Sequence, residues 1–351
     1  MNSILLYTGT LIFSTVGCFT SKNWLVIWFW IELNSLALIP IISSNVNSRS
    51  IESTTKYFLF QAIGSVVLLL GVLLRLFVNG TILIEGDYSV FSISIIIVAV
   101  ALKMGIFPNH YWFVDVMQGV NLMTGFFLSI ISKIVPLYVI IVISNSSNSI
   151  LYLFIGTISV IVGSSFGIQQ TQLRKLIALS SVAHLGWMII LFSTTHNGTL
   201  GALIFVSYIL MTLPLFWIGN KFSLENLSKT SSVNIMSTVS LLMIISILSM
   251  AGFPPLLGFF YKWVMLSFIS NNGNYLVVFL LIGASLLSLF FYIQLCISFY
   301  FNIWPKTKTL LVSEYFSHQS IFFFTSIVIL SNVLVCLAVW YLPILSVNWS
   351  I

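Results

Sequence analysis

The stretch STVSLLMIISILSMAGFPPLLGFFYKWVMLSFI, residues 237–269, carries one charged side chain, Lys262, and two prolines, Pro254 and Pro255. As a single helix it would be about 50 Å long at 1.5 Å per residue. The hydrocarbon core of a bilayer is only about 30 Å thick. Proline removes a helix hydrogen bond and clashes with the preceding turn. We therefore predict a membrane-spanning helix that breaks near Pro254.

A second apolar stretch, residues 90–118, is also too long for one crossing and contains Pro108. The sequences at the two breaks are similar: Met104-Gly105-Ile106-Phe107-Pro108 and Met250-Ala251-Gly252-Phe253-Pro254. The two breaks fall in the fourth and ninth of the predicted spans given below. Because these spans are five crossings apart, an odd number, the two copies should cross the membrane in opposite directions. Paired interrupted helices in oppositely oriented halves indicate an inverted-repeat transporter.

The composition agrees with a membrane protein and excludes other classes. Of 351 residues, 59% are apolar and 6% are charged, whereas a soluble domain carries about 25% charged residues. The net charge of +6 is too thinly spread for a nucleic-acid-binding surface. Cys18, Cys296 and Cys336 lie singly in apolar segments, without the paired spacing of a zinc or iron–sulfur site. Residues 3–20 lack a basic leader, so we expect a retained span.

Apolar runs between polar or turn-forming segments predict an all-α polytopic protein with about eleven transmembrane helices. The predicted spans are 3–20, 24–43, 55–78, 90–118, 122–143, 149–168, 176–194, 199–219, 237–269, 274–301 and 320–342. We group them as two inverted five-helix repeats, residues 1–145 and 146–303, each with one broken helix. A loop and a C-terminal transmembrane helix, residues 304–351, follow.

The loop charges predict an orientation. The side that holds the N-terminus would receive eight basic residues: Arg49, Lys56, Arg174, Lys175, Lys221, Lys229, Lys306 and Lys308. The other side would receive two, Lys22 and Arg75. Because basic residues are in excess in loops on the inner side, the N-terminus should lie there.

Five ionisable residues inside the spans are the candidate functional residues: Glu32, Lys103, Lys133, His184 and Lys262. A charged side chain at mid-membrane costs about 2.5–3.5 kcal/mol on insertion scales. Three lysines cannot all form ion pairs with one acid, and desolvation disfavours the ammonium form. Such lysines can take up and release protons. The alternative is that the charges only hold helices together.

Two further groups leave more than one interpretation open. Ser180 lies one turn before His184, and both side chains can donate and accept hydrogen bonds. They suit a water-linked proton path, but His184 could equally be a core histidine bonded to a neighbouring helix. His110 and Asp115 are expected near the membrane surface, where they gate a proton exit or form a solvated helix end.

The sequence shows no site for a redox cofactor. It contains no glycine-rich phosphate loop after a strand, no histidine pair at haem spacing and no cysteine cluster. If the chain serves an oxidoreductase, another subunit must hold the cofactor.

Motifs from the second to the ninth span carry a family resemblance, and the run from Gln170 to Met188 is the most specific. The segments are Trp30-Ile31-Glu32-Leu33-Asn34, Leu102-Lys103-Met104-Gly105, His110-Tyr111-Trp112, Lys133-Ile134-Val135-Pro136, Gln170-Thr171-Gln172-Leu173-Arg174-Lys175, Ser180-Ser181-Val182-Ala183-His184-Leu185-Gly186-Trp187-Met188 and Gly252-Phe253-Pro254-Pro255-Leu256-Leu257-Gly258-Phe259 with Lys262-Trp263. They resemble the family of NADH dehydrogenase subunit 2, an antiporter-like membrane-arm subunit of animal mitochondrial respiratory complex I.

The resemblance implies two inverted five-helix repeats and the loss of three N-terminal helices found in bacterial counterparts. Glu32 and Lys103 look like the family's coupled glutamate–lysine pair. Lys133 looks like its central lysine, and Lys262 like the terminal lysine of the second half-channel. Three departures from the pattern stand out: Asn109 replaces the usual phenylalanine, Ser132 the usual glutamine and Tyr261 the usual proline.

The function implied is proton translocation coupled to electron transfer from NADH to ubiquinone, through a buried relay of Glu, Lys, His and water. The resemblance places the protein in the mitochondrial inner membrane, with the N-terminus in the matrix and the C-terminus in the intermembrane space. Its partners would be other membrane-arm subunits, including neighbouring antiporter-like subunits, and a lipid such as cardiolipin, without nucleic acid. NADH, FMN, iron–sulfur clusters and ubiquinone would bind elsewhere in the complex. The alternatives are a stand-alone cation/proton antiporter and a non-conducting scaffold subunit.

Overall fold

The computed structural model describes residues 2–44, 47–84, 86, 88–144, 149–195, 198–224, 226, 237–254 and 256–300. Twelve helices make up this part of the chain, and it contains no β-strand beyond two isolated bridges. The helices are α1 (Asn2–Thr20), α2 (Trp24–Ile42), α3 (Ser48–Asn79), α4 (Val90–Met104), α5 (Tyr111–Gly119), α6 (Leu122–Ser144), α7 (Ser149–Ile168), α8 (Leu173–Thr194), α9 (Gly198–Lys221), α11 (Ser237–Ala251), α12 (Leu257–Asn271) and α13 (Tyr275–Tyr300).

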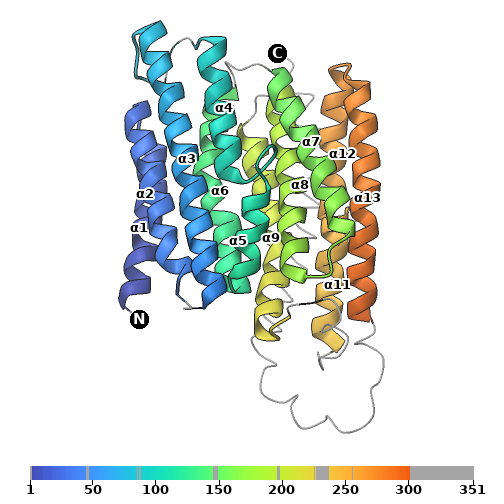
Figure 1. Ribbon diagram of the computed structural model, residues 1–351. Coiled ribbons are helices and arrows are strands. Elements are labelled where there is room, and N and C mark those ends of the chain that lie inside the picture. Colours follow the sequence, from blue (N-terminus) through green and yellow to red (C-terminus); the bar gives the residue numbers. More distant parts are fainter. Residues whose placement is uncertain are drawn as a thin grey trace.

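The helices stand side by side in one bundle, with α1 to α3 at one edge and α13 at the opposite edge (Figure 1). Within the described residues, seven helices are long and apolar enough to cross a membrane: α2, α3, α6, α7, α8, α9 and α13. Large apolar side chains such as Phe13, Phe77 and Phe279 are exposed on the outer helices. Exposed apolar faces of this extent suit lipid or partner helices.

Helix α8 is the centre of the bundle. It packs against α5, α6, α7, α9 and α12, and every residue from Leu176 to Ser193 is buried. Two glycines allow the close approach of α7 and α8. A Cβ atom on Gly186 would lie 2.2 Å from the Ser159 hydroxyl, and one on Gly156 would lie 2.9 Å from the Gly186 carbonyl oxygen.

The predicted break near Pro108 is confirmed. Helix α4 ends at Met104, Gly105 takes a left-handed conformation with φ of 68°, and α5 begins at Tyr111. Protein donors satisfy the carbonyl groups that the break frees. The Trp112 indole donates to the Leu102 oxygen at 3.0 Å, and the Gln61 amide of α3 donates to the Lys103 oxygen at 3.1 Å. Irregular backbone at this depth therefore has protein partners rather than lipid.

The predicted break near Pro254 is also confirmed. Helix α11 ends at Ala251, Gly252 takes a φ of 85°, and α12 begins at Leu257. In Figure 1, α4 and α5 run toward the end of the bundle that holds the N-terminus, whereas α11 and α12 run away from it. The two interrupted segments therefore run in opposite directions.

The described helices fall on the predicted spans from 3–20 to 274–301, with the two broken segments each appearing as two helices. The predicted span 320–342 and the segment 304–351 lie outside the described residues. The count of eleven crossings and the division into two repeats stay predictions.

Candidate functional site

Glu32 and Lys103 meet near the first break, as the family resemblance implied. Glu32 lies on α2 and Lys103 in the last turn of α4, and the Lys103 Nζ is 3.7 Å from the Glu32 Oε2. The lysine side chain is 1% exposed and the glutamate side chain 25%. Gly64 on α3 makes room for the lysine, because a Cβ atom there would lie 2.7 Å from the Lys103 Cγ. The pair is thus enclosed by three helices.

A small cavity of about 10 Å³ adjoins Lys103, which is room for about one water molecule. Helices α2, α3, α4 and α6 line it with Ile31, Asn34, Ser35, Tyr57, Gln61, Lys103, Ser132, Val135 and Pro136. The Asn34 Nδ2 is buried and makes no hydrogen bond to the described residues. The cavity therefore lies between Lys103 and the Ser132–Pro136 side of α6.

Lys133 lies fully buried on α6 without a carboxylate partner in the described part of the chain. Its Nζ donates a hydrogen bond to the Ser181 hydroxyl of α8 at 3.1 Å. The same atom lies 4.3 Å from the centre of the Phe113 ring and 5.8 Å from that of Tyr208. The amine is therefore contacted by one hydroxyl and lies near two aromatic rings.

His184 uses both ring nitrogens. The Tyr261 hydroxyl of α12 forms a hydrogen bond with Nδ1, and the Tyr292 hydroxyl of α13 lies 3.3 Å from Nε2. All three side chains are buried. The sequence left open whether His184 is a bonded core residue or part of a proton path, and this geometry is compatible with either.

Lys262 lies on α12 and reaches back across the second break. Its Nζ donates to the Ala251 oxygen at 3.0 Å and to the Met250 oxygen at 3.5 Å. The amine therefore satisfies two carbonyl groups at the end of α11. The residue before Lys262 in the chain is Tyr261, which contacts His184.

The five predicted residues lie at separate contacts rather than in one pocket, and within the described residues no hydrogen bond or ion pair joins Lys133 to Lys103 or to His184. Glu32 pairs with Lys103, and the cavity lies between Lys103 and α6. Ser181, the partner of Lys133, is three residues before His184 on the same helix. Through Tyr261, His184 is linked to the segment that carries Lys262.

Sequence reasoning missed several members of this series. It named Ser180, whose hydroxyl donates to the Ile177 oxygen and interacts with the Tyr292 hydroxyl. It did not single out Ser181, which contacts Lys133. Gln61 and Tyr292 had no local signal, since only the packing of α3 and α13 places them. For Tyr261, the only indication in the sequence was that a tyrosine replaces the proline usual in the family.

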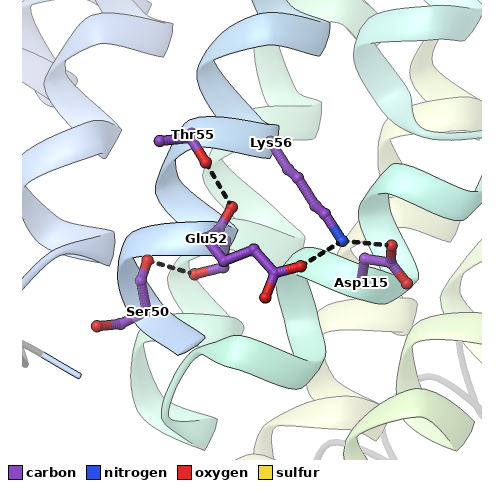
Figure 2. Close-up of polar contacts among 6 residues, drawn as sticks. Ser50, Glu52, Thr55, Lys56 and Asp115 are labelled. Atoms are coloured by element: carbon purple, nitrogen blue, oxygen red, sulfur yellow. Dashed lines mark hydrogen bonds and ion pairs between the residues drawn. The ribbon is translucent and has the colours of Figure 1, made fainter. Parts of the chain in front are cut away.

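An exposed cluster lies at the end of the bundle where α3 begins. Lys56 bridges Glu52 at 2.8 Å on the same helix and Asp115 of α5 at 3.0 Å (Figure 2). A surface pocket of about 170 Å³ adjoins them. Asp115 is thus a surface residue with a basic partner, whereas the His110 side chain is buried in the protein beside the rings of Tyr111 and Phe166.

Among the described residues, no three His, Cys, Asp or Glu side chains are grouped closely enough to hold a metal ion. The chemistry that the buried series can perform is proton exchange among amine, carboxylate, imidazole and hydroxyl groups.

Comparisons with known proteins define the class. Residues 21–288 match the family described as NADH:quinone oxidoreductase/Mrp antiporter, transmembrane. A chain of respiratory complex I from Thermus thermophilus superposes with a TM-score of 0.80 at 20% identity, covering 88% of this chain and 72% of that one. A chain of the Mrp complex from Dietzia sp. gives 0.70 at 17% identity, covering 84% and 58%. The fold is that of antiporter-like membrane subunits.

Closer relatives narrow the class to one family. The NADH-ubiquinone oxidoreductase chain 2 of Sus scrofa is 35% identical over 321 residues, which are 91% of this chain and 92% of that protein. That of Equus asinus is 34% identical over 339 residues, or 96% of each. The chain belongs to the NADH-ubiquinone oxidoreductase chain 2 family.

Proposed function

We propose that the chain is an antiporter-like membrane-arm subunit of respiratory complex I in the mitochondrial inner membrane. It contributes to proton translocation that is coupled to electron transfer from NADH to ubiquinone. Relatives with this name match over about nine tenths or more of both chains. The chain itself holds no redox cofactor, and NADH, FMN, the iron–sulfur clusters and ubiquinone bind other subunits.

The observation that carries this proposal is the series of buried polar groups from Glu32 to Lys262. Burying three lysines and one histidine in a membrane bundle costs free energy. Such residues are therefore rare in membrane spans and usually mark functional sites. Of these three buried lysines, only Lys103 has a carboxylate of the described residues within ion-pair distance. The groups Glu32, Lys103, Lys133, His184 and Lys262 act as a proton relay with internal water.

The topology that suits this function has eleven crossings in two inverted repeats, residues 1–145 and 146–303, followed by a C-terminal helix. The N-terminus lies in the matrix and the C-terminus in the intermembrane space. The opposite directions of the two broken segments support the repeats, and the basic residues of the loops support the orientation.

The partners are other membrane-arm subunits, including neighbouring antiporter-like ones, and a lipid such as cardiolipin. The chain covers only part of the bacterial antiporter-like chains it resembles. We infer that an adjacent subunit covers an outer face that longer homologues cover themselves.

The test is Lys133→Met, which removes the amine while retaining much of the side-chain volume. Lys56→Met is the matched control, because Lys56 is a lysine in the exposed surface cluster. Complex containing each variant is checked for assembly on a native gel, reconstituted in proteoliposomes and assayed for proton uptake per NADH oxidised. We expect the Lys133 variant to assemble and to take up fewer protons per NADH than the control. Equal uptake would favour a scaffold role, and a small oligomer in place of the large complex would favour a stand-alone antiporter.

A further inference from the structure

Two buried hydrogen-bond donors face the small cavity beside Lys103. The Asn34 Nδ2 and the Lys103 Nζ are both buried, and neither has a hydrogen-bond partner among the described residues. Both residues line the cavity of about 10 Å³. The Glu32 Oε2, 3.7 Å from the amine, lies beyond hydrogen-bond distance. Because an unsatisfied buried donor costs free energy, an acceptor in this cavity would stabilise both groups.

Pro136 leaves an acceptor at the opposite wall. Within α6, the carbonyl of Ser132 would normally accept a hydrogen bond from the N–H four residues later. That residue is Pro136, which has no N–H. Ser132 and Pro136 both line the cavity. The α6 side of the cavity therefore holds a backbone carbonyl that lacks its usual donor.

One water molecule matches these groups in size and chemistry. A buried water needs about 10–15 Å³ of cavity and two to four polar partners, and it can accept two hydrogen bonds and donate two. The Lys103 amine and the Asn34 amide supply two donors, and the Ser132 carbonyl supplies an acceptor. The Tyr57 hydroxyl of α3, which also lines the cavity, can either donate or accept.

We propose that this cavity is a water-binding site, and that Asn34 and Pro136 are positioning residues that act on Lys103 through the bound water. The Asn34 amide donates to the water, and the water donates to the Ser132 carbonyl. The second lone pair of the water then accepts a hydrogen bond from the Lys103 amine. The amine has the Glu32 carboxylate on its α2 side and the water on its α6 side.

This inference deepens the proposed function and rests on it, because Lys103 is one of the groups of the proposed relay. A proton leaves an amine along a hydrogen bond, either direct or through one water. The bound water supplies that hydrogen bond on the side of Lys103 that faces α6. The proline inside α6 thereby has a role, because it frees the carbonyl that orients the water.

Two variants remove the water by independent changes. Asn34→Leu removes the amide donor with little change in size. Pro136→Ala restores an N–H that can bond the Ser132 carbonyl, and so takes the acceptor away from the water. Alanine is a far better helix former than proline, so Pro136→Ala does not act by weakening α6.

Each variant has a matched control. Gln294→Leu removes an exposed amide from α13. Pro214→Ala replaces a buried proline inside α9 that does not line the cavity. Each change is introduced into the gene for this chain, and the whole complex is purified and checked for assembly on a native gel.

The first measurement is a cryo-electron microscopy map of each complex at a resolution that shows ordered water. We expect a water peak in the cavity of the wild type and of both controls, within hydrogen-bond distance of the Asn34 Nδ2 and the Lys103 Nζ. Neither Asn34→Leu nor Pro136→Ala should show it. A wild-type cavity without a peak would overturn the proposal, and so would a peak that remains in both variants. The wild-type map decides the first point even if a variant fails to assemble.

The second measurement is proton uptake per NADH oxidised in proteoliposomes. Loss of a positioned group in a proton transfer slows the transfer by about 100-fold or more, so both variants should lose this chain's share of uptake while the controls keep it. The melting temperature of the Pro136→Ala complex should equal or exceed that of the wild type. Wild-type uptake in a variant that has lost the water would overturn the positioning role, and so would a lower melting temperature of the Pro136→Ala complex.

The two proposals fail in different ways. If Lys133→Met lowers uptake but the wild-type map shows no water in the cavity, the relay stands and the water site falls. If the water behaves as expected but Lys133→Met takes up as many protons as its control, the water site stands and the relay falls.

Discussion

Replacing Glu32 with glutamine tests whether the Glu32–Lys103 pair conducts protons or only joins helices. At 3.7 Å and an effective dielectric constant of about 20, the attraction between the two charges is about 4 kcal/mol. This is an upper value, because a quarter of the Glu32 side chain is exposed. It corresponds to at most roughly a thousandfold preference for the ammonium form of Lys103. Without the carboxylate, Lys103 should stay neutral and have no proton to release.

The two interpretations differ in what the single and double variants do. If the pair is structural, Glu32→Gln leaves an unpaired buried charge, which costs about 3–5 kcal/mol and impairs assembly. Adding Lys103→Met would then restore both assembly and pumping. If the pair is a relay, either single variant assembles because the lysine can lose its proton, but pumping falls. The double variant stays impaired because no titratable group remains.

The measurement is proton uptake per NADH oxidised by the assembled complex in proteoliposomes. Glu52→Gln is the control, because Glu52 is also a glutamate paired with a lysine but is 65% exposed. Exposed pairs of this kind contribute at most about 1 kcal/mol, so this variant should pump normally. Normal pumping by the Glu32→Gln/Lys103→Met double variant would refute the relay.

Three further outcomes follow from the breaks and the topology. Gly258→Ala should prevent assembly, because its Cβ atom would lie 1.7 Å from a backbone oxygen of α11, an overlap costing above about 3 kcal/mol. Gly283→Ala, with no atom within 4 Å of the new Cβ, should assemble normally on the same native gel. Lys262→Met removes the amine that donates to the Ala251 oxygen. Because an unsatisfied buried carbonyl costs about 1–3 kcal/mol, the melting temperature of the extracted complex should fall. An unchanged melting temperature would show that other donors replace the amine. Trypsin added to mitoplasts should not cleave at Lys221, and cleavage there from outside would contradict the proposed orientation.

The sequence predicted the helices and the breaks because both depend on local chemistry. Apolar length predicts a crossing wherever the chain lies, and Pro108 and Pro254 interrupt a helix whatever surrounds them. The pairing of Glu32 with Lys103 was implied by the family resemblance, because the residues alone left open which of the three lysines would meet the one buried acid.

The remaining contacts depend on how each helix is rotated about its axis. Helix α8 is buried on all sides, so its sequence has no polar face to indicate which residue points where. The contact between Ser181 and Lys133 follows only from the packing of α8 against α6. Tyr292 is 108 residues from His184 in the chain, and only the position of α13 beside the core places the two together.

The central position of α8 has a mechanical consequence. Ser181 and His184 are three residues apart, about 4.5 Å along one rigid helix. A rotation or shift of α8 that separates Ser181 from Lys133 therefore also displaces His184 from its two tyrosines. A movement of α8 as a whole therefore changes the contacts of Ser181 with α6 and of His184 with α12 and α13 together.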